Sequence, residues 1–190
     1  MANKVKFGLK NVHYAKVTET LDPETGKWTT TYGEVKAWPG AVNLSLSAAG
    51  DQTDFFADDI NYESSVANQG YEGDYESALI PEDVYISILG QSKDETTGLV
   101  TESADDVDSY VALMFEISGD KSKRRFVLYR VKFTRPNIDA STIESSKEVK
   151  TDSVSMKATP RLDDGKIRAF ANEGDGTAYA KFFESVQVAA

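Results

Sequence analysis

The acidic residues are the side chains in this sequence whose type and spacing come nearest to a chemical site. Four aspartates lie close together at Asp51, Asp54, Asp58 and Asp59, and carboxylate oxygens are the ligands that hard cations prefer. A calcium-binding loop, however, has acids at alternate positions, a glycine at the sixth position and a glutamate at the twelfth. The four aspartates lack this spacing, so we interpret them as exposed loop acids and predict no metal site.

A second acidic group, Glu72, Asp74 and Glu76, has the two-residue period of one face of a β-strand. Glycoside hydrolysis also requires two carboxyl groups, but they must flank the sugar within a pocket. Neighbours on one face of a strand do not meet that requirement. Because unpaired carboxylates are costly to bury, we predict that this acidic stripe faces water.

The remaining reactive residue types form no recognisable catalytic or cofactor site. The absence of cysteine excludes disulfides, thiolate metal sites and cysteine nucleophiles. The single histidine, His13, comes without a nucleophile motif such as G-x-S-x-G, and we interpret it as a structural strand residue. The glycine-rich residues 174–177 lack the lysine of a phosphate-binding loop. We therefore expect a protein that is not an enzyme and has no catalytic, cofactor-binding or metal-binding residues.

Charge is distributed unevenly along the chain, whose formal net charge is −10. Residues 51–83 contain ten acids and no lysine or arginine, whereas residues 121–135 contain seven bases and no acid. A net negative charge disfavours DNA binding, because affinity for DNA comes chiefly from cations that neutralise phosphates. Blocks of opposite sign suit self-association. We predict that the basic segment, including Arg124 and Arg125, contacts an acidic surface of another copy.

The 190 residues are expected to form a single domain, since the chain is of ordinary domain length and contains no linker. Short alternating segments separated by turn residues predict a mainly β protein, an antiparallel β-sandwich or barrel. Residues 60–67 and 70–79 are expected to be the arms of one hairpin, joined near residue 69. Residues 111–117 and 125–133 are expected to form the central hairpin.

One flanking α-helix is predicted at about residues 81–89. Pro81 suits the first helical position, the acids Glu82 and Asp83 complement the helix dipole, and Gly90 suits the C-terminal stop.

A long polar loop is predicted at about residues 91–108. Loops of this length are uncommon in compact domains unless they are functional or disordered. We expect the loop to become ordered against a neighbouring copy. Its predicted interface residues are Asp94, Glu95, Glu102, Asp105 and Asp106.

The segments of the first 160 residues, in their order, resemble the major tail proteins of long-tailed bacteriophages with non-contractile tails. No segment in this resemblance is a catalytic signature. The segments are Pro39-Gly40-Ala41-Val42-Asn43-Leu44-Ser45-Leu46, Phe55-Phe56-Ala57-Asp58-Asp59, Tyr62, Gly70-Tyr71-Glu72-Gly73-Asp74-Tyr75-Glu76, Ile88-Leu89-Gly90, Tyr110-Val111-Ala112-Leu113-Met114-Phe115-Glu116 and Arg135-Pro136.

The resemblance implies a tail-tube fold, a β-sandwich with a flanking helix, and hexameric rings stacked into a hollow tube through which the genome is ejected. It implies a virion protein of the tail, assembled in the host cytoplasm. Its partners would be further copies of itself and other tail proteins at the tube ends, with no membrane and no specific binding of the passing DNA. In such a tube we predict that the lumen-facing residues are Glu63, Glu72, Asp74 and Glu76.

Two alternative functions remain open at this stage. A tube protein of a secretion or contractile-injection system shares the same general fold. A β-sandwich carbohydrate-binding or adhesion module belongs to a different class, and would use aromatic residues as a sugar platform. The residues considered for that platform are Tyr14, Trp28, Tyr32 and Trp38.

Overall fold

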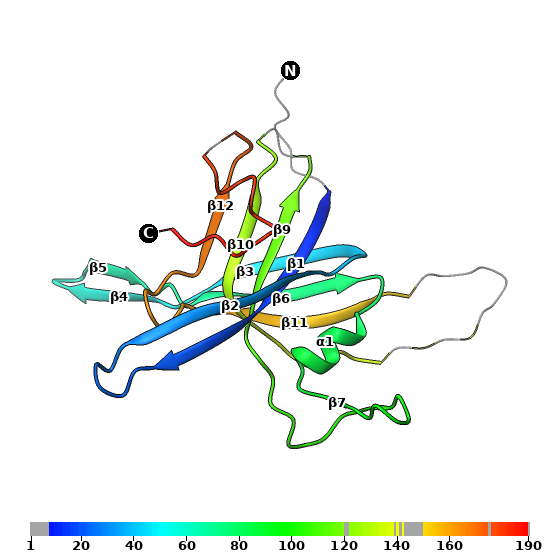
Figure 1. Cartoon of the computed structure of the whole chain (residues 1–190). Helices are drawn as coiled ribbons and strands as arrows, with labels where there is room; N and C mark the ends of the chain where they lie inside the picture. Colours follow the sequence, from blue (N-terminus) through cyan, green and yellow to red (C-terminus); the bar gives the residue numbers. More distant parts are fainter. Residues whose placement is uncertain are drawn as a thin grey trace.

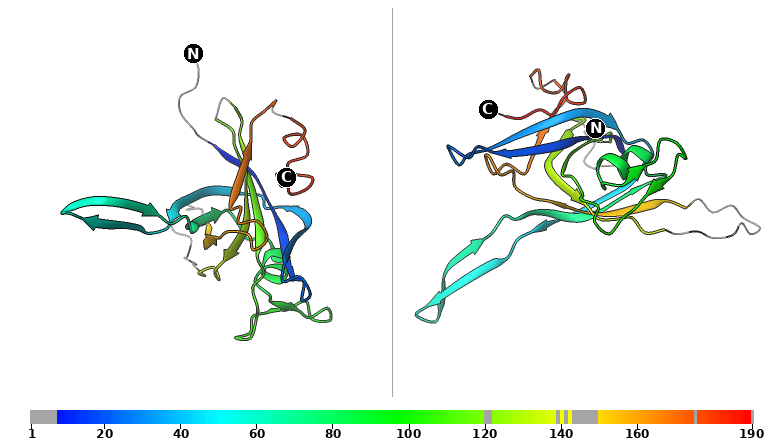
Figure 2. Two further views of the ribbon diagram at one scale, coloured as in Figure 1. Left: turned by 90° about the vertical axis from the view of Figure 1, so that its left-hand side faces the viewer. Right: turned by 60° about the horizontal axis from the view of Figure 1, so that its bottom comes forward.

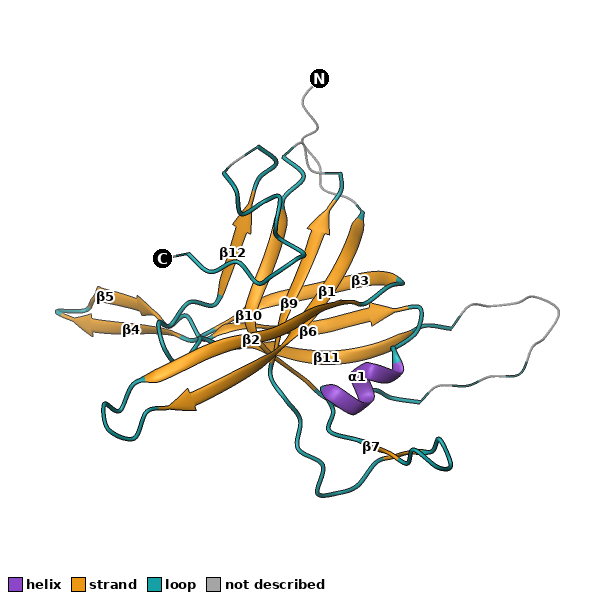
Figure 3. Cartoon of the chain, viewed as in Figure 1, coloured by secondary structure: helices purple, strands orange, loops and turns teal. Residues whose placement is uncertain are grey.

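The computed structural model describes residues 8–119, 122–138, 140, 142, 150–174 and 176–189. The fold is mainly β, with 49% of residues in strands and 4% in helix, as the sequence predicts. Its main antiparallel sheet has the strand order β2-β1-β9-β10-β11-β6-β3, and β12 also pairs with β10 (Figures 1 and 3). The strands of this sheet are β1 (Leu9–Leu21), β2 (Trp28–Ala37), β3 (Ala41–Ala49), β6 (Gly70–Ser77), β9 (Val111–Ile117), β10 (Arg125–Phe133), β11 (Asp152–Ala158) and β12 (Arg168–Ala171).

The hairpin of β9 and β10 lies in the middle of this sheet, which confirms the predicted central hairpin. Alternate residues of β9 enter two different hydrophobic clusters. Leu113 and Phe115 belong to the larger cluster, whereas Ala112 and Met114 belong to the smaller one. Because β9 is buried on both faces, its sequence is a continuous apolar run rather than an alternating one.

Trp38 lies at the centre of the larger cluster. Its ring makes edge-to-face contacts with Tyr14, Tyr75 and Phe133, at centroid distances of 5.9, 5.0 and 5.5 Å. Its indole nitrogen donates to the hydroxyl oxygen of Ser77 at 3.3 Å. This packing brings together residues of β1, β6 and β10, which are far apart in the strand order, so the sheet curls around the larger cluster.

The helix α1 (Glu82–Ser87) covers this core at one end (Figure 3). Val84 and the following Ile88 and Leu89 are buried in the larger cluster. The predicted flanking helix is therefore confirmed, although it is shorter than predicted. It begins directly after Pro81, and the turn ends at Ile88, whose amide bonds to the carbonyl oxygen of Val84.

The smaller cluster is covered by the C-terminal residues 176–189, which contain turns and no strand. Phe182 is buried against the sheet, and Phe183 stacks on the ring of His13 at 4.6 Å. The imidazole Nδ1 lies 2.9 Å from the carbonyl oxygen of Asn11. These contacts give His13 a structural place on β1, in agreement with its interpretation from the sequence.

The predicted hairpin of residues 60–67 with 70–79 is wrong. Strand β5 (Ile60–Val66) pairs with β4 (Gln52–Ala57) in a separate two-stranded sheet, whereas β6 pairs with β3 and β11. Strands β5 and β6 are therefore successive parts of one arm of a long, interrupted hairpin. Its turn lies at Asp58 and Asp59, whose φ angles of 52° and 60° fit the two central positions of a type I′ turn.

Gly70 explains why the sequence suggested a turn in the wrong place. A glycine after Asn68 and Gln69 is typical of a turn, but here the chain continues along the same arm. The glycine is required by a close approach, because a Cβ atom at this position would lie 1.9 Å from the carbonyl oxygen of Ala158 on β11. Its φ of 107° is also unfavourable for other residues.

The long loop after α1 contains a small hairpin of β7 (Ser92–Lys93) and β8 (Val100–Thr101). The Asp94 carboxylate accepts hydrogen bonds from the amides of Thr96 and Thr97, and the Gly98 amide donates to the Asp94 carbonyl at 2.7 Å. The position of the loop agrees with the prediction, but the segment is not irregular throughout.

Candidate functional site

The hairpin of β4 and β5, called the projecting hairpin below, extends beyond the body of the protein (Figures 1 and 2). It carries several large apolar side chains that a monomer leaves in solvent. An isolated two-stranded hairpin is only marginally stable in water. The exposed apolar side chains of the projecting hairpin do not pack into a core that would stabilise it. The exposed fractions are 60% for Phe55, 65% for Phe56, 60% for Ile60, 69% for Tyr62 and 70% for Val66.

Polar hydrogen bonds hold the projecting hairpin together internally. The Ser64 hydroxyl donates to the Asp54 carboxylate at 2.6 Å, and the Asn61 side chain donates to Ser64. Phe55 and Tyr62 make an edge-to-face contact at 6.4 Å. The Tyr62 ring nevertheless stays largely exposed in the isolated chain. An exposed aromatic group of this kind is typical of a protein-binding surface.

Three of the four clustered aspartates have roles within this hairpin. Asp58 and Asp59 form its turn, and Asp54 accepts hydrogen bonds from Ser64 and Gln52. In the described part of the chain, no three His, Asp or Glu side chains gather in a way that could hold a metal ion.

The acidic stripe lies on the outer face of β6, between β3 and β11. Glu72 and Asp74 are exposed there, whereas Tyr75 is fully buried on the opposite face, so the alternation of faces is confirmed. Their neighbours on the same face are polar. These neighbours are Asn43, Ser45 and Ser47 on β3 and Ser153, Ser155 and Lys157 on β11.

Glu63 does not belong to this stripe. It is exposed on β5 and faces Phe55 across the projecting hairpin. Of the predicted lumen-facing residues, the structure therefore brings together Glu72, Asp74 and Glu76 and separates Glu63 from them.

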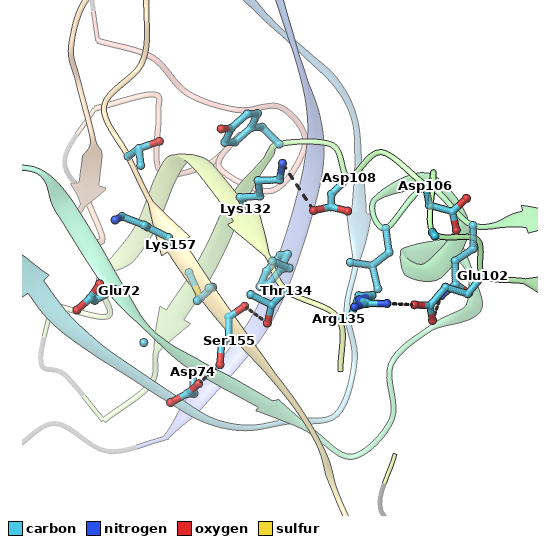
Figure 4. A pocket seen from close by; sticks show the side chains of 18 of the residues that line it. Glu72, Asp74, Glu102, Asp106, Asp108, Lys132, Thr134, Arg135, Ser155 and Lys157 are labelled. Carbon is cyan, nitrogen blue, oxygen red and sulfur yellow. Dashed lines mark hydrogen bonds and ion pairs between the residues drawn. The ribbon is translucent and has the colours of Figure 1, made fainter. Parts of the chain in front are cut away.

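An open groove of about 1020 Å³ lies beside the stripe (Figure 4). Most of its charged groups already have partners within the chain. Lys132 lies 3.6 Å from Asp108, Arg135 lies 2.6 Å from Glu102, and Ser155 donates to Asp74 at 2.6 Å. Ligand pockets have a few polar groups that converge on the ligand, whereas most charged groups of this groove are engaged within the chain.

Bases of the described residues 122–135 also have partners inside the chain, and Lys121 lies outside the described residues. The Arg125 guanidinium donates to Glu116 at 3.2 Å and to the carbonyl oxygen of Tyr179 at 2.6 Å, and lies over the Tyr179 ring. Arg130 pairs with Glu19 at 2.8 Å. Arg125 therefore holds the C-terminal segment on the sheet of its own chain. Arg124 lies instead on the other face of β10, over the ring of Phe170 at 6.0 Å.

Some of the predicted interface acids of the loop have partners within the chain, and the others are exposed. Asp94 stabilises the turn of the small hairpin, Glu102 pairs with Arg135, and Asp106 accepts from the Ser103 amide at 2.8 Å. Glu95 and Asp105 are exposed. The pair of Lys93 with Glu82 at 2.6 Å also joins the loop to the helix. Exposed ion pairs contribute about 0–1 kcal/mol each, so the loop is only weakly attached.

Glu116 is a buried acid whose role sequence reasoning missed. Its carboxylate accepts from Lys10 at 3.1 Å, from Asn11 at 3.2 Å and from Arg125 at 3.2 Å. Burial alone would raise the pKa of Glu116, but these hydrogen bonds outweigh that effect and hold the pKa below its usual value. The only sequence signal was a charged residue at the end of an apolar strand.

We expect Glu116→Gln to lower the free energy of unfolding by about 2 kcal/mol at pH 7, less than for a fully buried pair because Lys10 is half-exposed. A lowered pKa stabilises the fold above the unfolded-state pKa, and that contribution disappears as the pH falls through the folded-state pKa. The difference between the two proteins should therefore shrink in acid. Urea unfolding between pH 7 and pH 3 measures it, with Glu24→Gln in an exposed turn as the control; a constant difference would contradict the assignment.

Two of the four aromatic residues considered for a sugar platform are not at the surface. Trp38 and Tyr14 are buried in the larger cluster. The Tyr14 hydroxyl donates to Asp83 at 2.6 Å, which occupies its polar end. These residues fill the core, as aromatics usually do in β proteins.

Comparisons with protein families and with curated proteins found no relative of this chain. No protein-family model matches the chain, and no curated protein matches it significantly. Within the described residues, no helix has both the length and the apolar character that crossing a membrane requires. The projecting hairpin and the acidic stripe are therefore interpreted from their own geometry.

Proposed function

We propose that this protein is a tail-tube subunit of a long-tailed bacteriophage, which assembles into stacked hexameric rings around a channel for DNA. The observation that carries the proposal is the projecting hairpin. It exposes five large apolar side chains on an arm that has no core of its own, and another copy of the chain can cover them. The ring size, the virion setting and the tail partners at the tube ends rest on the sequence resemblance.

The two outer strands of the main sheet support an assembly of this kind. Strands β2 and β3 stand at the ends of the strand order and are 10 and 9 residues long. Long edge strands offer backbone groups for pairing with another chain. Two different edges joined head to tail produce a ring when the rotation closes. A closed ring of strands leaves no edge exposed and can surround an aqueous channel.

The acidic stripe supports a channel for DNA. DNA carries about one negative charge per 1.7 Å of its axis, so a basic wall would bind it and an acidic wall would repel it. Glu72, Asp74 and Glu76 lie on one exposed polar face, and the proposal directs this face into the lumen. Passage of DNA then requires no specific contact.

Replacing Glu72, Asp74 and Glu76 together by lysine should leave ring formation largely intact and impair DNA ejection from assembled particles. The expected result follows because these side chains contribute charge to the face and little to the core. Release of DNA after receptor triggering measures it. The control reverses two exposed acids outside the proposed contacts, Glu24 and Glu184. Normal ejection through tails built from the first variant would overturn the lumen assignment.

Electron microscopy of the purified protein tests the proposed function directly. A tube subunit forms rings or filaments, and their proportion rises with protein concentration. A carbohydrate-binding module remains a monomer and binds glycans measurably. A monomer at every concentration, with glycan affinity, would overturn the proposal.

A further inference from the structure

A row of phenylalanine rings crosses β9, β10 and β12 and ends at the protein surface. Phe115 stacks on Phe126 at 5.3 Å, and Phe126 contacts Phe170 at 5.7 Å. Phe115 and Phe126 are buried, but Phe170 is 51% exposed. We call these three rings the aromatic shelf. Its outer end is a supported apolar surface, because Phe170 packs on the buried Phe126 ring, which itself stacks on Phe115.

Two arginines flank the outer end of the aromatic shelf. The Arg124 guanidinium carbon lies 6.0 Å from the centre of the Phe170 ring. Arg168 precedes Phe170 by two residues on β12, so both side chains lie on the same face of the strand. Arg168 also lies over the Tyr71 ring at 5.3 Å. The nearby acid Glu173 is paired with Lys123 at 2.7 Å. The shelf therefore combines exposed aromatic surface with positive charge.

The projecting hairpin has the complementary chemistry. Residues 51–66 contain five acids and no lysine or arginine. Two of these acids, Asp58 and Asp59, are exposed at the turn, next to the exposed Phe56 and Ile60. An acidic, aromatic tip fits a surface of arginine and phenylalanine through ion pairs, ring contacts and cation–π contacts.

We infer that the tip of the projecting hairpin of one copy docks on the aromatic shelf of a second copy. Asp58 and Asp59 then face Arg124 and Arg168, and the apolar side chains of the tip cover Phe170. The inference rests on the proposed function and names the surface that one subunit offers to the next. The contact joins two different surfaces, so repeated copies form a ring or a filament rather than a symmetric pair.

The exposed apolar tip of the β1–β2 hairpin is a weaker partner for the projecting hairpin. Leu21 and Trp28 are partly exposed there, opposite each other in the register. The turn between them contains Asp22 and Glu24 against a single Lys27. A second acidic surface would repel an acidic hairpin, which favours the shelf.

Charge exchange tests the contact. The hairpin variant combines Asp58→Arg with Asp59→Arg, and the shelf variant carries Arg168→Glu, alone or with Arg124→Glu. Each variant alone should raise the protein concentration needed for half-assembly at least about tenfold, which corresponds to about 1.4 kcal/mol. An equimolar mixture of the two variants should recover most of the loss, because alternating copies then meet only through opposite charges, and one chain that carries both sets should recover likewise.

Sedimentation velocity and electron microscopy measure the assembly, and circular dichroism verifies that each variant is folded. The matched control reverses the exposed acids Glu24 and Glu184 and should assemble like the unmodified chain. Assembly unaffected by the hairpin and shelf reversals, or impaired by both but not restored when they are combined, would overturn the inference.

Cross-linking gives a second readout that does not require rings. Because the chain has no cysteine, Asp59→Cys in one copy and Arg168→Cys in a second, tagged copy introduce the only thiols. A disulfide needs Cα atoms within about 7 Å, so the mixed disulfide should form under a mild oxidant and exceed both symmetric products.

The outcomes separate the two proposals. Rings without the mixed disulfide retain the proposed function and overturn the docking surface. The mixed disulfide without rings or filaments retains the docking surface and overturns the tube. The absence of both products overturns both proposals.

Discussion

Replacing Phe55, Phe56 and Tyr62 together by serine is expected to abolish assembly while the monomer stays folded. These side chains are mostly exposed in the isolated chain, so their removal takes little from the core. In an assembly they would be the apolar centre of a contact, where a few aromatic residues provide most of the binding free energy. Single truncations at such positions cost about 2 kcal/mol or more, so three together should shift assembly beyond accessible concentrations.

Electron microscopy and sedimentation measure the loss of rings, and thermal unfolding of the monomer measures its stability. The matched control is Leu162→Ser, at an exposed leucine in a turn outside the hairpin; it should leave both properties unchanged. The assignment of the hairpin to assembly fails if the triple variant still forms tubes in normal yield. Loss of the folded monomer would show instead that the hairpin belongs to the fold.

Trp38→Ala is expected to lower the free energy of unfolding by about 3–5 kcal/mol, the cost typical of removing a large buried aromatic. Trp38 is 1% exposed and contacts three other aromatic rings, so the cavity left behind would be lined by rigid groups. The same substitution would also leave the hydroxyl of Ser77 without its indole donor. Urea unfolding followed by circular dichroism measures the change.

Trp28→Ala provides the control, because it removes the same side chain from a partly exposed position at the end of β2. It should cost less than about 1 kcal/mol. Similar losses for the two variants would contradict the central position of Trp38 in the core. The comparison of the two variants also tests whether the two tryptophans act together at a sugar-binding surface, because such a role would not require Trp38 for stability.

Several basic side chains are engaged in ion pairs within the chain. The sequence shows a basic block at residues 121–135, and simple charge counting would assign all of it to a partner. Arg125, Arg130 and Arg135 instead pair with acids of the same chain. The proposed contact rests mainly on Arg168, which lies outside the block, together with Arg124 beside the Phe170 ring.

Local patterns determined much of the fold from the sequence alone. Alternation predicted the strands and the two faces of β6, because the side-chain period of a strand is two and a carboxylate is costly to bury. The apolar run of β9 and the facing run of β10 predicted the central hairpin. Pro81 and the acids after it predicted the start of α1. These features depend on interactions between residues close in the chain.

The β7–β8 hairpin could have been predicted by the same local reasoning. Its turn has an aspartate four residues before a glycine, Asp94 and Gly98, and the β1–β2 turn has the same spacing at Asp22 and Gly26. In both turns the glycine amide donates to the aspartate carbonyl, and the aspartate carboxylate accepts two backbone amides.

Tertiary structure alone decided which strands pair and which charges meet. Nothing near Gly70 in the sequence indicates that β11 passes close to it, so a glycine required by that approach looked like a turn. Arg125 and Glu116 are neighbours because β9 and β10 place them opposite each other, and Arg124 meets Phe170 only because β12 pairs with β10. Strand register and ion pairs of this kind depend on contacts between segments far apart in the chain, which residue periodicity does not encode.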